Sequence, residues 1–472
     1  MARLRRNPAG RATLAALALL AAPARGEEPA PPAGAPGTAP LPAKELPEHD
    51  WFAPIAEIVG FNAVNWAIDR YVLKADWAKV SGATIWRNAR FVWTFDTDDF
   101  NTNQFLHPYS GSFYYTAARS SGFGFWESSL FAFGGSLMWK LAGEVGPASI
   151  NDQITTPIAG TILGEALFRI SRLVLGGGPS PNAGRQVGAL LISPASQLNY
   201  WLLDGHIKDP DPPVPSYRGH VSAGVSLGNA AGEFGSFSVP FQARFAFQLT
   251  YGLPEDVRLH LPFDHFEASL ELSSATAQPW AYLHDPRGPE WLLEVRGLAL
   301  GGETPTGEPG RTLYGLYGLF DFGGPVLVRV GETGFGPGAA IAEHLARDVL
   351  VEATFIAALT FGTAGGYAPR VVDRDYAYGV AAFFVADGKL FWGDRTELHL
   401  TGRAVAVPDA VGGGSEELVL GTASARVRIA GPHAVSLDGT ASFRNVALPG
   451  SSYRERSVYA GASYAFLFGS GR

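Results

Sequence analysis

In the second half of the chain, side chains alternate between apolar and polar over many consecutive runs. In the run 241–250, Phe241, Phe245 and Leu249 share one register, and Arg244 and Gln248 share the other. A period of two places successive residues on opposite faces of a β-strand. The same alternation recurs from residue 218 to 468, and the charged residues stay in the polar register. This pattern predicts strands that are apolar on one face and polar on the other.

Residues 218–472 are therefore expected to form an antiparallel transmembrane β-barrel. We count about twelve runs of roughly nine to thirteen residues, the length that a tilted strand needs to cross a bilayer. Turn clusters such as 412–415 and 431–433 separate the runs. The last run ends at Phe466 and Phe468 and resembles the terminal strand that the outer-membrane barrel assembly machinery recognises. The expected partners are that machinery and outer-membrane lipid.

Composition favours this barrel over a soluble β-sandwich, which would make the chain a periplasmic binding module. Sandwich strands also alternate, but only 17% of the residues are charged, against about 25% in soluble domains. Cysteine is absent, which excludes disulfides, thiolate zinc sites and a lipidated cysteine. The net charge of -8 is not concentrated in one run, and no basic stripe occurs, so nucleic acid is not an expected partner.

The N-terminus has the pattern of a secretory signal peptide over residues 1–24. Arg3, Arg5 and Arg6 form a positive segment, an apolar run follows from 12 to 22, and a small-residue cleavage site ends the pattern. Residues 25–50 are rich in Pro and Ala and are expected to form a linker. The mature protein is expected in the cell outer membrane.

Residues 51–205 have helical spacing of apolar side chains, which gives an α+β fold with an N-terminal helical module before the barrel. The predicted helices are one that begins near Trp51 and ends near Lys74, followed by 125–144, 151–175 and 185–203. Asn151 or Asp152 is expected to cap the third helix. Gly160 and Gly164 form a small-xxx-small pair that permits close helix packing. The module is expected to face the periplasm, either beneath the barrel or as a plug in its lumen.

Polar residues of the helical module are the candidates for chemistry. His107 is a candidate general base, with Glu144 or Asp152 to orient it. The alternative is a buried histidine that donates to a backbone carbonyl, because no nucleophile motif accompanies it. Asp96, Asp98 and Asp99 supply oxygen ligands that could hold Ca²⁺, but their spacing departs from an EF-hand. A polar loop without a metal is the expected state.

A second group of polar residues is a candidate binding site. Arg119 and Arg169 could bind an anionic group such as a lipid phosphate. The other candidate members of this site are Tyr109, Glu127 and Glu165. Since the signs of these charges nearly balance, an internal ion-pair network is the alternative.

Several motifs in the segment from Asp96 to Arg172, about a sixth of the chain, together resemble a known family. They are His107-Pro108-Tyr109, Gly111, Tyr114, Ala118-Arg119, Gly122, Phe125-Trp126, Ser128, Gly135-Ser136, Trp139, Glu144, Ser149-Ile150-Asn151-Asp152, Gly160, Gly164-Glu165 and Arg169. In this combination the segment resembles an uncharacterised bacterial envelope family, domain of unknown function 3943. The resemblance implies a helical module joined to a barrel in the cell envelope, and it implies no activity. The run from Glu144 to Gly164 is also similar to the helix pair of VanZ-like membrane proteins, with Thr155 and Thr156 where that family has Asn.

The expected function is a non-enzymatic outer-membrane barrel that acts in transport, lipid handling or envelope organisation. The alternative is an envelope hydrolase or transferase that acts on a lipid or cell-wall precursor through the His107 group. No phosphate-binding loop, dinucleotide fingerprint or zinc helix occurs in the sequence, so no cofactor is expected.

Overall fold

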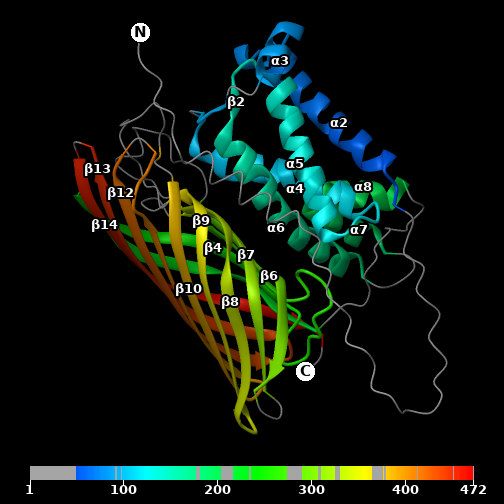
Figure 1. Ribbon diagram of the computed structural model, residues 1–472. Helices are drawn as coiled ribbons and strands as arrows, with labels where there is room; N and C mark the ends of the chain where they lie inside the picture. Colours follow the sequence, from blue (N-terminus) through cyan, green and yellow to red (C-terminus); the bar gives the residue numbers. More distant parts are fainter. Residues whose placement is uncertain are drawn as a thin grey trace, which may run out of the picture. The chain divides into compact units, whose positions relative to one another are not determined.

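The structure is a computed structural model that describes residues 49–470 with several gaps. The gaps are 91–92, 97, 177–180, 203–215, 233–234, 274–289, 307–309, 325–329, 364–375, 377–378, 412 and 450. The expected signal peptide and nearly all of the expected linker lie outside the described residues. The described part consists of a helical module followed by a β-barrel (Figure 1).

The helical module contains more helices than the four expected. They are α2 (Phe52–Ala67), η1 (Ile68–Val72), η2 (Asp76–Ala78), α3 (Gly82–Ala89), η3 (Thr102–Leu106), α4 (His107–Arg119), α5 (Phe125–Ala142), α6 (Ile150–Leu175), α7 (Ala183–Ile192) and α8 (Pro194–Leu202). Two short strands, β1 (Trp93–Thr94) and β2 (Ala148–Ser149), pair in parallel. None of the described helices is both long enough and apolar enough to cross a membrane.

Helix α4 was not among the predicted helices, because its apolar residues show no clear helical period in the sequence. Pro108 lies in its first turn, where a missing N–H costs least, and Gly111 lowers its intrinsic helix propensity. The cap of α6 also differs from expectation, because the Ser149 side chain accepts from the backbone N–H of Asp152. Neither Asn151 nor Asp152 is the capping residue, and Pro157 lies well inside the helix.

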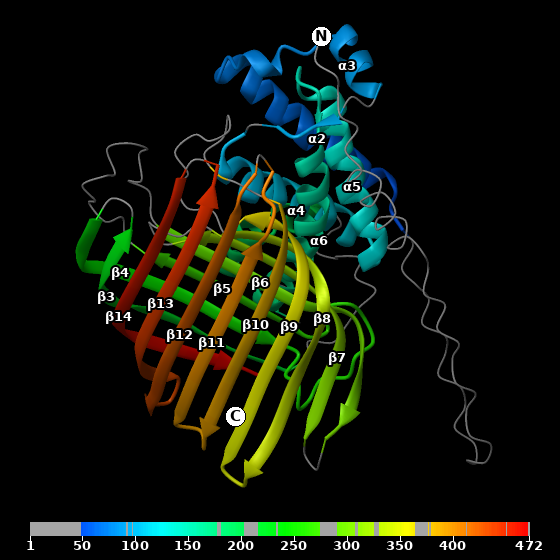
Figure 2. The ribbon, with the colours of Figure 1, turned by 60° about the vertical axis from the view of Figure 1, so that its left-hand side comes forward.

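The barrel is closed and has twelve antiparallel strands, as expected (Figure 2). They are β3 (Tyr217–Gly232), β4 (Gly235–Tyr251), β5 (Phe266–Ser273), β6 (Glu290–Pro305), β7 (Arg311–Gly324), β8 (Val330–Ala346), β9 (Val349–Thr363), β10 (Gly379–Trp392), β11 (Thr396–Val407), β12 (Ser415–Ala430), β13 (His433–Leu448) and β14 (Ser451–Gly469). The last strand pairs with the first, from Arg456 with Ala231 to Gly469 with Arg218. Most strands are longer than the predicted thirteen residues, because backbone pairing continues past the alternating segment.

The two registers of each strand have different surroundings. Thr250, Glu267 and Arg296 lie side by side across β4, β5 and β6 and face the lumen. The neighbouring row, Leu249, Ala268, Val295 and Phe320, faces outward. The alternation in the sequence therefore separates the inner face of the barrel from its outer face.

The helical module packs on the outer face of β4–β8. Its described residues do not plug the lumen, which was one of the two predicted positions. Phe100 and Phe105 stack on the outward ring of Phe322, with centroids 5.5 and 5.0 Å away. A Cβ built on Gly318 would lie 3.0 Å from Cγ1 of Ile162 in α6. Arg169, near the end of α6, pairs with Asp264 in the β4–β5 connection at 3.2 Å. Strand periodicity identifies an apolar outward face but does not say what covers it.

Candidate functional site

Three helix ends converge on a group of charged side chains, here called the His107 cluster. His107 begins α4, Lys140 lies in the last turn of α5, and Asp152 lies in the first turn of α6. The β1–β2 pair holds the segment before α6 beside the segment that contains Asp96 and Asp98. Residues far apart in the sequence therefore meet at one place.

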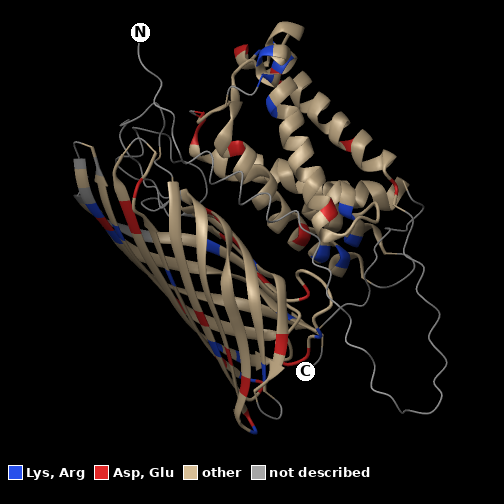
Figure 3. Ribbon diagram, in the orientation of Figure 1, with Lys and Arg blue, Asp and Glu red and all other residues tan. Residues whose placement is uncertain are grey.

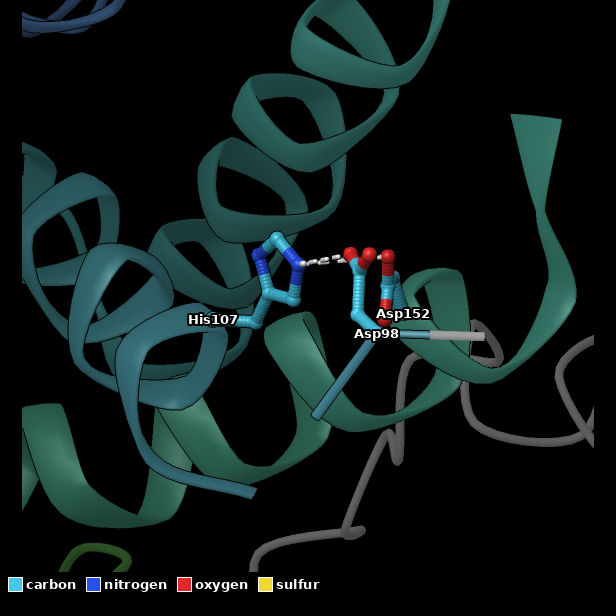
Figure 4. Close-up of side chains that lie close together, drawn as sticks. All are labelled: Asp98, His107 and Asp152. Carbon is cyan, nitrogen blue, oxygen red and sulfur yellow. Dashed lines mark ion pairs between the residues drawn. The ribbon is translucent and has the colours of Figure 1, made fainter. Parts of the chain in front are cut away.

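Asp152 is at the centre of this cluster. Its Oδ2 lies 3.3 Å from Nε2 of His107 and 2.5 Å from Nζ of Lys140. Lys140 also pairs with Glu144 at 2.9 Å, and the Asp98 carboxylate lies 3.9 Å from the same Nε2 atom of His107. Figure 4 shows the imidazole of His107 pointing toward both Asp98 and Asp152.

Burial differs sharply within the His107 cluster. The side chains of Asp152 and Lys140 are 0% and 1% exposed, whereas His107 is 13% and Asp98 is 48% exposed. The cluster is therefore reached from solvent past Asp98 and His107. A buried lysine beside two carboxylates supplies the charge that makes their burial tolerable.

Polar neighbours extend the cluster toward the barrel. Asp96 accepts from Asn103 at 2.8 Å and from Asn151 at 3.1 Å. Asn103 also donates to the hydroxyl of Tyr376, which lies between β9 and β10, at 2.7 Å. Hydrogen bonds thus connect the base of the site to a barrel residue.

Burial and charge shift the pKa values of the cluster in opposite ways. Burial raises the pKa of Asp152 from 3.8 to about 6, against the lowering effects of His107 and Lys140. Burial, the largest single effect, lowers the pKa of His107, but Asp152, Asp98 and Glu144 together outweigh it and the net pKa is raised. Burial also works against ionisation of Asp96, yet its hydrogen bonds hold its pKa well below the ordinary value. Contact between the raised-pKa carboxyl of Asp152 and the imidazole of His107 is the arrangement in which an aspartate orients a histidine base.

The cluster also has the composition of a cation site. Asp98, His107 and Asp152 each offer one ligand atom, and these atoms lie within 4.8 Å of one another. One imidazole and two carboxylates suit a divalent transition metal. Lys140 already contacts the same Asp152 oxygen, so its ammonium supplies positive charge where an ion would sit.

The structure brings together most of the predicted catalytic and metal-binding residues. His107, Asp152 and Glu144 share the cluster, with Lys140 between the two carboxylates. Asp99 lies apart, because it accepts from the backbone N–H groups of Asn101 and Thr102. Lys140 was not predicted. Its spacing of four from Glu144 was the available signal.

The predicted anion-binding residues divide into two groups. The carboxylate of Glu165 accepts hydrogen bonds from Nε of Arg119 at 3.0 Å, from Nε of Arg169 at 2.7 Å and from the hydroxyl of Tyr115 at 2.7 Å. All four side chains are buried. The two arginines thus neutralise an internal carboxylate, which agrees with the ion-pair alternative.

Tyr109 and Glu127 lie away from this network. Tyr109 stacks on Phe105 with centroids 5.9 Å apart. Glu127 accepts from the backbone of Gly124 at 2.9 Å and caps α5.

A polar cavity of about 570 Å³ lies inside the barrel. Its wall carries both signs of charge, with pairs such as Lys389 to Glu267 at 2.5 Å and Arg244 to Glu271 at 2.8 Å. Turn residues of the β10–β11 connection, including Asp394, line one end. The cavity is therefore at the end of the barrel that holds the start of β3 and the end of β14.

Beyond the cavity the lumen is filled by side chains. Phe383, Val405 and Leu418 are buried in one apolar cluster that spans β7 to β13. Arg444 pairs with Glu416 and Glu455, both at 2.9 Å, and is fully buried. The described side chains of this cluster therefore fill the lumen beside the cavity.

The match to known families concerns the helical module. Residues 92–195 match the family described as Domain of unknown function (DUF3943). The resemblance drawn from the motifs is confirmed for this segment. The DUF3943 segment holds the whole His107 cluster and the Glu165 network. The similarity to VanZ-like proteins stays a prediction.

Solved structures with partial likeness are outer-membrane proteins. The COG4313 outer membrane channel from Pseudomonas putida F1 is 12% identical, with coverage of 55% of this chain and 97% of that chain and a TM-score of 0.29. The outer membrane protease OmpT from Escherichia coli is 8% identical, with coverage of 54% and 97% and a TM-score of 0.23. The toluene transporter TodX from Pseudomonas putida is 7% identical, with coverage of 54% and 90% and a TM-score of 0.23. No curated protein matches the sequence.

Proposed function

We propose that this chain is an outer-membrane β-barrel protein that takes a small polar or zwitterionic solute into its lumen. The observation that carries the proposal is the contrast between the two faces of the barrel wall. Outward residues on the uncovered strands are apolar and exposed, as Leu359, Leu400 and Leu437 are at 70, 64 and 67%. Inward residues include many paired charges. An apolar outside with a polar inside is the pattern of barrels that stand in lipid.

The lining of the cavity favours a solute with both signs of charge or none. Glutamates and arginines alternate around it and pair with one another, as Arg426 does with Glu397 at 2.7 Å. A solute that replaces one partner of such an ion pair needs both hydrogen-bond donors and acceptors. A strongly ion-selective pore is instead lined by charges of a single sign.

The filled part of the lumen favours uptake that needs a structural change over free diffusion through an open pore. The apolar cluster around Phe383 and the ion pairs of Arg444 fill the lumen beyond the cavity. A solute would enter from the open end and would pass only when these side chains rearrange. A lipid headgroup could occupy the same cavity, since headgroups are also small and zwitterionic.

Membrane fractionation with a heat-modifiability test on the same sample examines this proposal. We expect the chain in the outer-membrane fraction, with a folded band that shifts in a gel only after boiling. A soluble band without such a shift would overturn both the membrane placement and the transport role.

A second candidate function is an envelope hydrolase or transferase, and the 3.3 Å contact between His107 and Asp152 favours it. An aspartate that orients a histidine is part of many general-base sites. Turnover of p-nitrophenyl esters by the purified barrel, lost in His107→Ala but kept in Glu127→Gln, would support this function. Equal rates in His107→Ala and the unaltered protein would rule it out for acyl transfer.

A further inference from the structure

Helix α2 and the η1 turn that follows it expose their apolar side. From Phe52 to Val72, every residue of which is described, the exposed positions are all apolar apart from one tyrosine hydroxyl. They are Phe52, Ile55, Ala56, Val59, Gly60, Ala63, Val64, Ile68, Tyr71 and Val72. We call this surface the α2 face. Its positions recur every three or four residues, so they form one continuous stripe along the helix.

The polar residues of α2 point the other way, into the module. Asn62 is buried and accepts from the hydroxyl of Tyr114 at 2.5 Å. Glu57 is half-buried, and its carboxylate accepts a hydrogen bond from Nδ2 of Asn199 at 3.4 Å. A helix on the surface of a soluble domain has the opposite arrangement, with its polar side in water. The α2 face therefore requires an apolar neighbour.

The position of the module against the barrel indicates what that neighbour is. The helices cover the outer wall over β4–β8, where Phe266, Val295 and Phe320 are at most 1% exposed. On the uncovered strands the same register is exposed and is proposed above to contact lipid. The module thus covers part of the outer wall of the barrel, beside strands whose outward residues are exposed and apolar.

The end of the α2 face carries aromatic and basic residues together. Trp77 and Trp86 are exposed. Arg70 lies over the ring of Tyr71 at 6.0 Å, and Arg90 lies over Trp86 at 5.5 Å. Figure 3 shows Lys and Arg at the α3 end of the module, a second basic group at the opposite end near α7, and little charge along α2. Tryptophan beside arginine and lysine is typical of the headgroup level of a membrane.

We propose that the α2 face lies in a lipid leaflet, with the α3 end at the level of the lipid phosphates. A lipid occupant fits better than a protein partner, because the α2 face offers no charged side chain and a protein interface normally adds directed polar contacts. The inference rests on the proposed membrane placement of the barrel and adds that the helical module is part of the membrane-embedded body.

Single cysteines test this directly, because the chain contains none of its own. Val59→Cys and Val64→Cys report on the α2 face, Leu437→Cys on the outward wall of β13, and Asp394→Cys on an exposed turn. Each variant is labelled with an environment-sensitive fluorophore and reconstituted into vesicles of phosphatidylethanolamine and phosphatidylglycerol. Quenching is then measured with nitroxide-labelled acyl chains and with aqueous iodide.

We expect labels at 59 and 64 to be quenched by the acyl-chain nitroxide to the same extent as the label at 437. Quenching by iodide alone, as at 394, would mean that the α2 face is in water and would overturn the inference. Protection from both quenchers would mean that protein covers it, including residues 1–48 of this chain, and would also overturn it. If the label at 437 is itself quenched only by iodide, the membrane placement of the barrel fails as well.

Discussion

The carboxyl of Asp152 is removed from water and depends on protein groups for its charge balance. Lys140 and His107 both lie on its Oδ2, and Lys140 is shared with Glu144. Breaking one member of such a group leaves an unpaired buried charge, which costs several kcal/mol. The His107 cluster is therefore a stability element whatever chemistry it performs.

The stability of the helical module should fall as pH rises from about 4 toward neutrality. Burial raises the pKa of Asp152 in the folded state from 3.8 to about 6, and the pKa of His107 is also raised. The folded state therefore binds more protons than the unfolded state, through Asp152 between about pH 4 and 6 and through His107 from about pH 6.5 upward, so deprotonation favours unfolding. The Asp152 shift corresponds to about 3 kcal/mol. Thermal unfolding followed by circular dichroism at helical wavelengths measures the effect.

Asp152→Asn is the variant that isolates this pH effect. We expect a flatter pH dependence between about 4 and neutral pH, since neither the Asp152 titration nor its pull on His107 remains. Asp98→Asn is the matched control, because Asp98 is half exposed and should change the slope little. An unchanged slope in Asp152→Asn would contradict the assignment.

Glu165→Gln should destabilise the module by about 3–5 kcal/mol, because Arg119 and Arg169 would lose their shared buried carboxylate. Asp264→Asn removes a partly exposed partner of Arg169 and should cost less. Thermal unfolding of both variants gives the comparison. Equal losses would mean that Glu165 does not hold the network together.

Individual site residues could be predicted only as far as their chemistry shows in the sequence. His107, Glu144 and Asp152 were visible as rare polar residues in an apolar segment. Lys140 was overlooked because it lies within a predicted helix, where a lysine ordinarily faces water. Asp99 was grouped with Asp96 and Asp98 by adjacency, but its side chain caps the next turn.

At the level of elements, the closest contact in the module is between α4 and α6. A Cβ built on Gly160 would lie 2.4 Å from the carbonyl carbon of Gly111, and one on Gly111 would lie 2.0 Å from the carbonyl oxygen of Thr156. Both glycines therefore let the two backbones touch. The packing role predicted for Gly160 is confirmed by this contact.

Gly160→Ala should push α4 and α6 apart and destabilise the module by about 1–3 kcal/mol or more. Gly134 in α5 is the matched control, because nothing lies within 4 Å of a Cβ built there. Gly134→Ala should be neutral or slightly stabilising through helix propensity. Thermal unfolding of the two variants separates contact from propensity, and equal effects would argue against the close crossing.

Strands were easier to predict than helices in this chain, for a physical reason. Each strand pairs with two neighbours in a closed sheet, so its two faces keep distinct surroundings and the alternation stays regular. Helix α4 is buried on most sides among α2, α5, α6 and α8. A helix surrounded by protein has no polar stripe, and its 3.6-residue period is lost.

For the whole molecule, closure of the lumen determines what can pass. We expect the reconstituted protein to show little steady conductance, because Phe383 and Leu418 fill the lumen. The double variant Phe383→Ala with Leu418→Ala should open a measurable conductance. Phe384→Ala is the control, since Phe384 is the same residue type one position along and is 53% exposed on the outer face. Equal currents from all three proteins in planar bilayers would refute closure by these side chains.

The strand number and the division into two parts were predictable, but the docking of the helical module was not. An apolar residue facing outward from a barrel satisfies the same pattern whether lipid or a helix covers it. The residues that distinguish the two cases, Phe320 and Phe322 beneath the helices and Leu400 and Leu437 in the open, belong to the same apolar classes. Only the tertiary contacts show which outward residues lie beneath helices and which are exposed.

The covered outer wall also limits how copies of this protein meet. Barrels in a membrane associate side by side through their outward faces, and here part of the outward face of β4–β8 is already covered by helices. In the part of the chain that the structure describes, the arc from β9 through β14 to β3 is the longest stretch of wall with exposed apolar residues (Figure 2). Two copies that associate through this arc around a two-fold axis bury the same surface on each copy. If copies of this protein associate through their walls, the one-sided cover therefore favours closed pairs over rows or sheets of barrels.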